Sequence, residues 1–289
     1  MKVLVFGADG MIGSTMIRVI AENNDLQVYG TLRTDTAKNY FPAYISDNLL
    51  SGINAENQDT LLKVFEEVNP DVVINCIGVT KHLTCSQDPL ISILLNALLP
   101  HRLEKICNIS GARLIHISTD CVFSGKKGGY TEDDIADAND IYGKTKYLGE
   151  VNNTSSITLR TSTIGHELKT RRGLLEWFLS QENSCKGYAN AIFSGLPTII
   201  LARIIRDIVI QRNDLYGLYH ISGPPISKYE LLKIIAKIYK KPINIEYNDE
   251  LCIDRSLNSD RFKKITGYEP PDWMELIETM HLYQSKINK

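Results

Sequence analysis

The 289-residue sequence has few cysteines and no excess of charge of either sign. Its 6 cysteines include no Cys-x-x-Cys pair, so the sequence indicates neither a zinc site nor thioredoxin-like redox chemistry. The 32 basic and 34 acidic residues leave a net charge of −2, and one short basic stretch stands out, at Lys169–Arg172. This balance argues against a protein that binds nucleic acid.

Long apolar runs are absent as well. No stretch of 18 apolar residues occurs, so we expect no membrane-spanning helix. The first expected strand begins at Lys2, which leaves no room for a signal peptide. Internal repeats, low-complexity tracts and flexible linkers are also missing. We therefore expect a cytoplasmic protein with reduced cysteines, no contact with membranes and no bound metal.

A glycine pattern stands directly after the first expected strand, residues 2–6, which is apolar and β-branched in the way of a buried parallel strand. The pattern is Gly-x-x-Gly-x-x-Gly, and apolar residues at helical spacing follow it. Such glycines allow a sharp turn, a close approach of backbone to a diphosphate, and tight packing of the helix on the sheet, while the helix N-terminus attracts phosphate. The residues that we assign to a dinucleotide on this basis are Gly7, Gly10, Met11 and Ile12, with Gly13 packing the helix.

The residue after the second expected strand, 26–31, bears on which dinucleotide binds. Many dinucleotide-binding folds carry an acidic residue there to hold ribose hydroxyls. This sequence has no acid at that place and has Arg33 instead. Arg33 either pairs with the 2′-phosphate of NADPH or lies solvated in a loop. Asn54, at the expected end of the third strand, is assigned to the adenine edge.

The alternation of strands and helices continues along the chain. We expect a helix at 57–67, a strand at 72–75, a helical run at 89–110 and a strand at 113–118. The small-residue loop after the strand at 72–75 suits a cofactor ribose, and its residues are Ile77, Gly78 and Val79. This order predicts an α/β fold with a doubly wound parallel sheet of the Rossmann type.

Tyr142 and Lys146 lie four residues apart on an expected helix and so share one face. A phenol is a poor proton donor at neutral pH unless a neighbour lowers its pKa, and the lysine charge does this. Thr119 ends the strand that precedes this helix, and its hydroxyl can orient a reacting oxygen. A Tyr-x-x-x-Lys pair alone is common on amphipathic helices. Here the pair follows both a glycine turn of the Rossmann type and a strand that ends in a hydroxyl residue. This order of features predicts catalysis by Thr119, Tyr142 and Lys146.

Three motifs together resemble a known family: Gly-x-x-Gly-x-x-Gly, Ser118-Thr-Asp-x-Val-Phe and Tyr142-Gly-Lys-Thr-Lys-x-x-Gly-Glu. The combination is similar to the extended short-chain dehydrogenase/reductases, and within them to the dTDP-4-dehydrorhamnose reductase family, over essentially the whole chain. The resemblance implies an oxidoreductase that reduces a 4-keto-6-deoxy nucleotide sugar with NADPH. It assigns Tyr142 as the acid and Lys146 as its partner and ribose ligand. The chain departs from the family at Cys121, where tyrosine is usual, and in the loop at 77–79.

Beyond an expected strand at 156–161 the sequence changes character, which indicates an NADP-binding Rossmann domain at 1–164 and a smaller, mainly substrate-binding lobe at 165–289. The boundary between them is soft, because we expect elements of the lobe to return to the sheet. Arginines suit diphosphate oxygens and an aromatic ring covers a sugar or a base, which favours a substrate role for Arg172 and Trp177. A solvated loop over a core tryptophan is the alternative. The residues assigned to substrate are Lys81, Asp120, Val122, Arg172, Trp177 and Arg255.

Two other functions stay open. One is a nucleotide-sugar epimerase of the same superfamily, although Arg33 without a nearby acid argues against tightly held NAD⁺. The other is a non-enzymatic, NADP-binding regulatory subunit similar to the β-subunit of methionine adenosyltransferase. The sequence does not determine the sugar, the nucleotide, the stereochemistry at C4 or whether the chain forms a homodimer.

Overall fold

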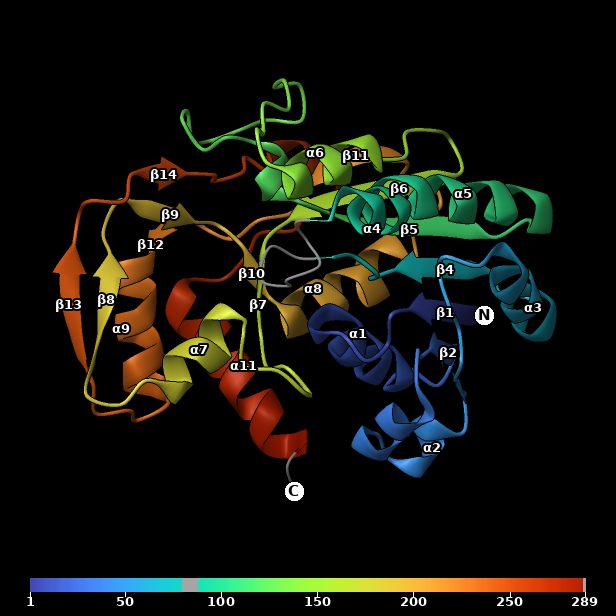
Figure 1. Cartoon of the computed structure of the whole chain (residues 1–289), viewed down its shortest axis with the longest axis horizontal. Helices are drawn as coiled ribbons and strands as arrows, with labels where there is room; N and C mark the ends of the chain where they lie inside the picture. Colours follow the sequence, from blue (N-terminus) through green and yellow to red (C-terminus); the bar gives the residue numbers. More distant parts are fainter. Residues whose placement is uncertain (80–87, 288–289) are drawn as a thin grey trace. The chain divides into compact units, whose positions relative to one another are not determined.

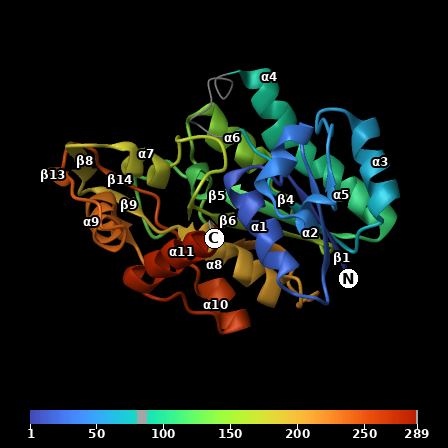
Figure 2. The ribbon, with the colours of Figure 1, turned by 90° about the horizontal axis from the view of Figure 1, so that it is seen from below.

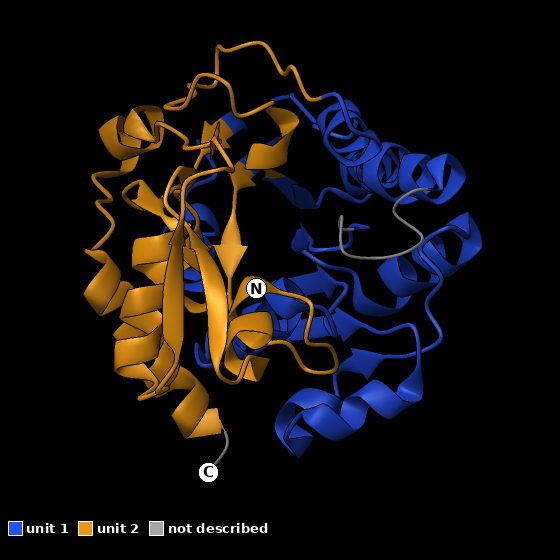
Figure 3. Cartoon of the chain, turned by 60° about the vertical axis from the view of Figure 1, so that its left-hand side comes forward, with its two compact units in different colours: residues 1–118, 139–159, 202–218 blue, residues 119–138, 160–201, 219–289 orange. Residues whose placement is uncertain are grey.

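A computed structural model describes residues 1–79 and 88–287, so Lys81 lies outside the described residues. The chain divides into two compact units (Figure 3). The first contains residues 1–118, 139–159 and 202–218, and the second contains residues 119–138, 160–201 and 219–289. Within the described part, no helix has the length and apolar character needed to span a membrane.

A seven-stranded sheet forms the framework of the fold (Figure 1). Its strand order is β11 (Gly217–His220), β6 (Ser156–Thr161), β5 (Arg113–Thr119), β4 (Val72–Asn75), β1 (Lys2–Phe6), β2 (Gln27–Thr31) and β3 (Leu49–Leu50). The pairs β1–β2, β1–β4, β2–β3 and β4–β5 are all parallel. The order moves outward from β1 in both directions, as in a doubly wound Rossmann sheet.

Helices cover both faces of the sheet in the first unit, with α3 and α5 on one side and α1 on the other (Figure 2). The helices of this unit are α1 (Met11–Ala21), α2 (Ala43–Ser46), α3 (Gln58–Val68), α4 (Pro89–Ser92), α5 (Leu99–Ser110) and α6 (Ile141–Leu148). Leucine, valine and phenylalanine side chains from β1, β4, β5, α3 and α5 form one buried cluster. This burial on both faces explains why the strands read as continuous apolar runs.

The helical run expected at 89–110 is present, but it is not a uniform α-helix. Between α4 and α5 the residues Ile93–Leu98 form a π-helical segment, η3. Pro100 follows at the start of α5, and a proline lacks the N–H that would continue the α-helical ladder. A widened turn at this point changes the direction of the side chains on the two sides of it.

The second unit contains short sheets and helices. Its strands are β7 (Thr163–Ile164), β8 (Ser184–Tyr188), β9 (Ala191–Phe193), β10 (Leu196–Pro197), β12 (Ile226–Ser227), β13 (Asn244–Asn248) and β14 (Ile253–Asp254). Its helices are α7 (Leu174–Ser180), α9 (Lys228–Ile238), α10 (Asp260–Thr266) and α11 (Trp273–Ile287), and α8 (Thr198–Ile204) begins in this unit and ends in the first. Ser227 caps α9 by accepting a hydrogen bond from Glu230 N at 3.1 Å.

The expected end of the third strand at Ile53–Asn54 is wrong. The strand is Leu49–Leu50, and Gly52 follows it with φ of 76°. The left-handed glycine ends the strand, although Ile53 N still donates to Leu32 O at 3.1 Å, and Asn54 lies in the turn that precedes α3.

Candidate active site

The glycine turn between β1 and α1 has the geometry that the sequence predicts. Gly7 has φ of 78°, a value that favours glycine. A Cβ on Gly13 would lie 2.0 Å from Gly7 O, so only glycine lets α1 lie this close to the end of β1. At Gly10 the nearest atom to a built Cβ is Gly7 O at 3.4 Å, an ordinary contact. The protein itself therefore leaves room at Gly10, and a glycine there fits a ligand that comes close to the backbone.

The N-terminus of α1 fits the phosphates of a dinucleotide. Its N-cap is Gly10, no side chain caps the helix, and its first turn holds no acidic residue. The first helical hydrogen bond runs from Ser14 N to Gly10 O at 2.9 Å, so the N–H groups of Met11 and Ile12 precede the helical ladder. Unclaimed N–H groups and the helix dipole both favour an anion at this place.

The loop after β4 lies beside the glycine turn. A Cβ on Gly7 would come within 2.9 Å of Ile77 Cγ1, and one on Gly78 would lie 3.9 Å from Lys146 Nζ. Ile77 N donates to Asn75 Oδ1 at 3.1 Å, which fixes the start of the loop. The first unit thus brings together the glycine turn, the loop at 77–79 and the lysine of α6.

Asn96, which is not among the site residues predicted from the sequence, holds this loop in place. Its Oδ1 accepts from Val79 N at 2.8 Å, and its Nδ2 donates to Val79 O at 3.1 Å and to Thr145 Oγ1 at 3.3 Å. These bonds join the loop, η3 and α6. The signal was visible, because Asn96 is the one polar residue in the apolar run Ile93–Leu99.

The start of α6 determines where Tyr142 and Lys146 lie. The Asp140 side chain caps the helix by accepting from Gly143 N at 2.7 Å. Tyr142 follows in the first turn and is half-buried, and Lys146 lies one turn later on the same face.

Lys146 is held in a dry environment and is only 4% exposed. Its Nζ donates to Ile117 O at 2.7 Å. Burial lowers the pKa of Lys146 to about 8, while the nearby Glu150 and Cys76 favour its charged form. At neutral pH the ammonium is therefore charged, and its field favours the phenolate of Tyr142.

Thr119 and Asp120 belong to the second unit and are described with it. Thr119 Oγ1 donates to Asp120 Oδ1 at 3.1 Å and accepts from Cys121 N at 3.1 Å. A hydroxyl carries one proton, so Thr119 gives it either to Asp120 or to a substrate oxygen. Burial raises the pKa of Asp120, and hydrogen bonds and the charge of Arg255 oppose that shift.

Arg255 lies near this pair within the second unit. Its Nε donates to Phe123 O at 2.7 Å, which fixes the guanidinium by one edge. Val122 has a different environment, because it is fully buried in a cluster with Phe123 and Tyr130. A substrate contact by the Val122 side chain would require this cluster to open, and its role stays a prediction.

The basic loop at 165–173 is tied to α7. Glu167 Oε2 accepts from Arg172 N at 2.8 Å, and His166 contacts both Glu176 Oε1, at 2.7 Å, and Tyr239 OH, at 2.9 Å. His166 thus links this loop to α7 and α9. The Arg172 side chain is exposed, and Trp177 on α7 is 36% exposed, so both are accessible to a ligand.

Arg33 and Asn54 follow the strands β2 and β3 of the first unit. Arg33 is exposed two residues after β2. Asn54 Oδ1 accepts from Glu56 N at 3.1 Å, so its carbonyl already stabilises a turn. The roles assigned to both side chains stay predictions.

A sequence profile of the family described as "RmlD substrate binding domain" matches residues 1–281. The chain belongs to this family. The predicted resemblance to the dTDP-4-dehydrorhamnose reductases of the extended short-chain dehydrogenase/reductases is therefore confirmed, as is the doubly wound α/β fold.

Three known proteins illustrate the range of this family's relatives. The chain is 23% identical to dTDP-4-dehydrorhamnose reductase of Aggregatibacter actinomycetemcomitans, over 98% of this chain and 99% of that protein. It is 25% identical to methionine adenosyltransferase 2 subunit beta of Xenopus laevis, over 83% of this chain and 73% of that protein. The crystal structure of dTDP-4-dehydrorhamnose reductase from Bacillus anthracis in complex with NADP has a TM-score of 0.79 at 22% identity, covering 98% of this chain and 99% of that one. Two of these three proteins are reductases, which agrees with the predicted oxidoreductase class.

Proposed function

We propose that this chain reduces the 4-keto group of a 4-keto-6-deoxy nucleotide sugar with NADPH, in the biosynthesis of deoxysugars or surface polysaccharides in the cytoplasm. The observation that carries the proposal is the arrangement in the first unit. There Lys146 is buried and shares a helix face with Tyr142. It also lies beside Gly78, and Ile77 of the same loop lies beside Gly7 of the glycine turn. Such a pair next to a dinucleotide cradle suits proton transfer to a carbonyl that is being reduced.

Different residues of the chain would bind the different parts of NADPH. The backbone at Gly7, Gly10, Met11 and Ile12 would receive the diphosphate, and Arg33 would pair with the 2′-phosphate. Ile77, Gly78 and Val79 would support a ribose, Asn54 the adenine, and Lys146 the hydroxyls of the other ribose. When bound, NADPH supplies the hydride that reduces C4.

The proton follows a separate route through the protein. Tyr142 O–H donates its proton to the sugar O4 as that oxygen gains negative charge, which completes the reduction of the carbonyl to an alcohol. Lys146 lowers the cost of the phenolate that this leaves behind. Thr119 turns its hydroxyl from Asp120 to O4 and orients that oxygen.

The nucleotide sugar would be held by residues of the second unit. Arg255 and Arg172 suit the diphosphate because a guanidinium matches two oxygens at once, and Trp177 suits a sugar or base face. Asp120 and Val122, together with Lys81, are assigned to the sugar itself. The sequence does not determine the sugar, so the substrates to test are dTDP-4-dehydrorhamnose and a UDP-N-acetyl-hexulose.

The test is an NADPH-oxidation assay against dTDP-, UDP- and GDP-linked 4-keto sugars. We expect one of them to drive stoichiometric loss of NADPH and to yield the 4-hydroxy sugar. Interconversion of two hydroxy sugars without net loss of NADPH would instead identify an epimerase. The absence of turnover with every 4-keto sugar would contradict the proposal.

The similarity to methionine adenosyltransferase 2 subunit beta supports a second candidate, a regulatory subunit that binds NADP without catalysis. That function predicts a stable stoichiometric complex with a larger enzyme on purification from the native source. It also predicts that Tyr142→Phe leaves the function of that complex unchanged.

A further inference from the structure

The end of β5 holds two side chains of opposite charge through neighbouring residues. Ile117 and Ser118 are adjacent in this strand. Ile117 O accepts from Lys146 Nζ at 2.7 Å, and Ser118 Oγ donates to Glu150 Oε1 at 2.7 Å. All four residues belong to the first unit. An ammonium and a carboxylate are thus each fixed by one of two consecutive residues of the same strand.

The chain after α6 also places Glu150 beside Lys146. Gly149 N still donates to Thr145 O at 3.1 Å, so the helical turn continues beyond the last residue of α6. Residues four apart on a helix share one face, and Glu150 lies four residues after Lys146. Glu150 is half-buried, and its partner Ser118 is 4% exposed. The bond to Ser118 therefore holds the carboxylate against the strand rather than in solvent.

Two other titratable groups face Lys146 from the sheet, and both are neutral at pH 7. Burial raises the pKa of Cys76, directly after β4, to about 12. Burial and the charge of Lys146 hold the pKa of His116, in β5, well below its usual value. Among the described residues whose charge acts on Lys146, Glu150 is therefore the one that is negative at neutral pH.

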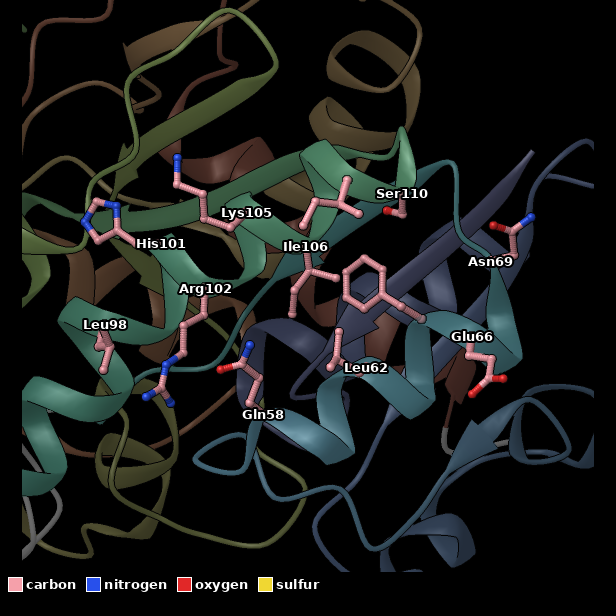
Figure 4. Close-up of a pocket in the computed structure, with 12 residues that line it drawn as sticks. Gln58, Leu62, Glu66, Asn69, Leu98, His101, Arg102, Lys105, Ile106 and Ser110 are labelled. Atoms are coloured by element: carbon pink, nitrogen blue, oxygen red, sulfur yellow. The ribbon is translucent and has the colours of Figure 1, made fainter.

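The elements packed on α6 bring no second carboxylate to Lys146 within the part of the chain that the structure describes. η3 and α4 pack against α6 and contain no acidic or basic residue. Asp140 caps the opposite end of the helix. His101 of α5, which lines a groove between α3 and α5 (Figure 4), donates to Leu148 O at 2.8 Å. Tyr142 is the phenol that the lysine supports. The charge of Lys146 thus depends chiefly on Glu150.

We propose that Glu150 is a positioning residue that acts through Lys146, keeping its ammonium charged so that Tyr142 can donate its proton over a wider range of pH. The inference rests on the proposed reduction. Burial disfavours the charged form of Lys146, and a fixed negative charge nearby favours it. Ser118 contributes by holding the carboxylate in place.

The direct test is the pKa of Lys146 in Glu150→Gln, measured from the pH dependence of the ¹³Cε chemical shift in protein with labelled lysine. The signal of Lys146 is the one that is absent from Lys146→Met. Glutamine keeps the acceptor for Ser118 and removes the charge, so the fold should survive, which circular dichroism checks. We expect the pKa of Lys146 to fall by about one unit or more. The alkaline limit of kcat for the 4-keto sugar should move down by the same amount.

Glu104→Gln is the matched control, since Glu104 is also a glutamate of the first unit, is 4% exposed and accepts from Asn153 Nδ2 at 2.7 Å. It should leave both the pKa of Lys146 and the limit of kcat as in the wild type. Ser118→Ala keeps the charge of Glu150 but releases the carboxylate, so it should lower the pKa of Lys146 by less than Glu150→Gln does.

An unchanged pKa of Lys146 in Glu150→Gln would overturn the proposal, whether or not the protein reduces a 4-keto sugar. An equal fall of this pKa in Glu104→Gln would also overturn it, as would a limit of kcat that stays in place while the pKa falls. A fall confined to Glu150→Gln and Ser118→Ala, in a protein that reduces none of the sugars, would support the link from Glu150 to Lys146 and contradict the proposed function instead.

Discussion

Among single residues, Lys146 has the environment that matters most for the proposed chemistry. It is nearly fully buried, it donates to Ile117 O, and burial lowers its pKa to about 8. A lysine with this pKa is charged at neutral pH and loses its charge only slightly above it. The support that it gives to the Tyr142 phenolate is therefore present below pH 8 and lost as the pH rises through that value.

This titration predicts an alkaline limit to catalysis. The kcat for the 4-keto sugar should fall above an apparent pKa near 8, which belongs to the Tyr142–Lys146 pair. In Lys146→Met the residual activity should lack this limb and NADPH binding should weaken, because the lysine also serves the ribose. At pH 10, about two units above its pKa, Lys146 is uncharged. A wild-type kcat that stays constant up to that pH would therefore contradict the role of Lys146.

Arg33 carries the prediction about cofactor choice. Charge-assisted contacts contribute roughly 1.5–3 kcal/mol, so Arg33→Ala should weaken NADPH binding by about ten- to a hundredfold and leave NADH binding unchanged. Lys38→Ala is the control, because Lys38 is a nearby cation that pairs with Asp35 at 3.1 Å. Calorimetry measures both affinities. A wild type that already prefers NADH would show that Arg33 is a solvated loop residue.

Among the elements, the turn between β1 and α1 separates ligand binding from folding. Gly10 has φ of −79° and ψ of 167°, which valine tolerates, and a Cβ there meets only Gly7 O at 3.4 Å. Gly10→Val should therefore fold normally and lose cofactor affinity by orders of magnitude. Gly13→Val should destabilise the fold itself, because its Cβ would lie 2.0 Å from Gly7 O. Urea unfolding and NADPH titration of both variants distinguish these effects, and normal NADPH affinity in Gly10→Val would refute the assignment of the turn.

The strands and helices of the Rossmann half could be predicted because apolar periodicity and glycine spacing are local signals. The π-helical segment Ile93–Leu98 could not, since a proline such as Pro100 permits a widened turn before it but does not require one. The end of the third strand was misplaced because Gly52 adopts a left-handed conformation that the sequence permits but does not require. Asn96 was missed for a related reason, since its partners Val79 and Thr145 are distant in sequence.

The site residues were predictable where a motif fixes their spacing, as in Tyr142 and Lys146. Site residues were harder to predict where their role depends on burial and on contacts with residues that are distant in the sequence. Val122 follows the Ser-Thr-Asp motif, yet it is fully buried. Its burial depends on a cluster formed with distant segments, so the residues next to it in the sequence do not predict it.

For the whole molecule, buried neutral histidines link stability to pH. Arg160 Nη1 donates to His220 Nε2 at 3.3 Å, and His220 Nδ1 donates to Tyr130 O at 3.1 Å, so the ring is neutral. Burial, together with the charge of Arg160, lowers the pKa of His220 to about 3. Burial likewise holds the pKa of His116 well below its usual value. Unfolding restores ordinary pKa values, so the unfolded chain binds more protons below pH 6.5 or so.

The free energy of unfolding should therefore fall as the pH drops below about 6.5, with up to about 1.4 kcal/mol per pH unit from each histidine. His220→Gln should be less stable at pH 7 and should show a shallower slope between pH 7 and pH 5, because His220 no longer contributes (its folded pKa is about 3). Urea unfolding at several pH values measures the slope. An identical slope in wild type and variant would show that His220 is not neutral in the folded protein.

The measurement that tests the central claim most directly is turnover by Tyr142→Phe on the 4-keto sugar that the wild type reduces. The variant loses one hydroxyl from a helix face, so folding and NADPH binding should be nearly unchanged. General acid catalysis is worth about 10²–10⁴-fold, and kcat should fall by that order while KM changes far less. Tyr147→Phe, on the same helix but at an exposed position, should keep wild-type turnover. Wild-type turnover by Tyr142→Phe would contradict the account, since Tyr142 would then be no more than part of a helix face.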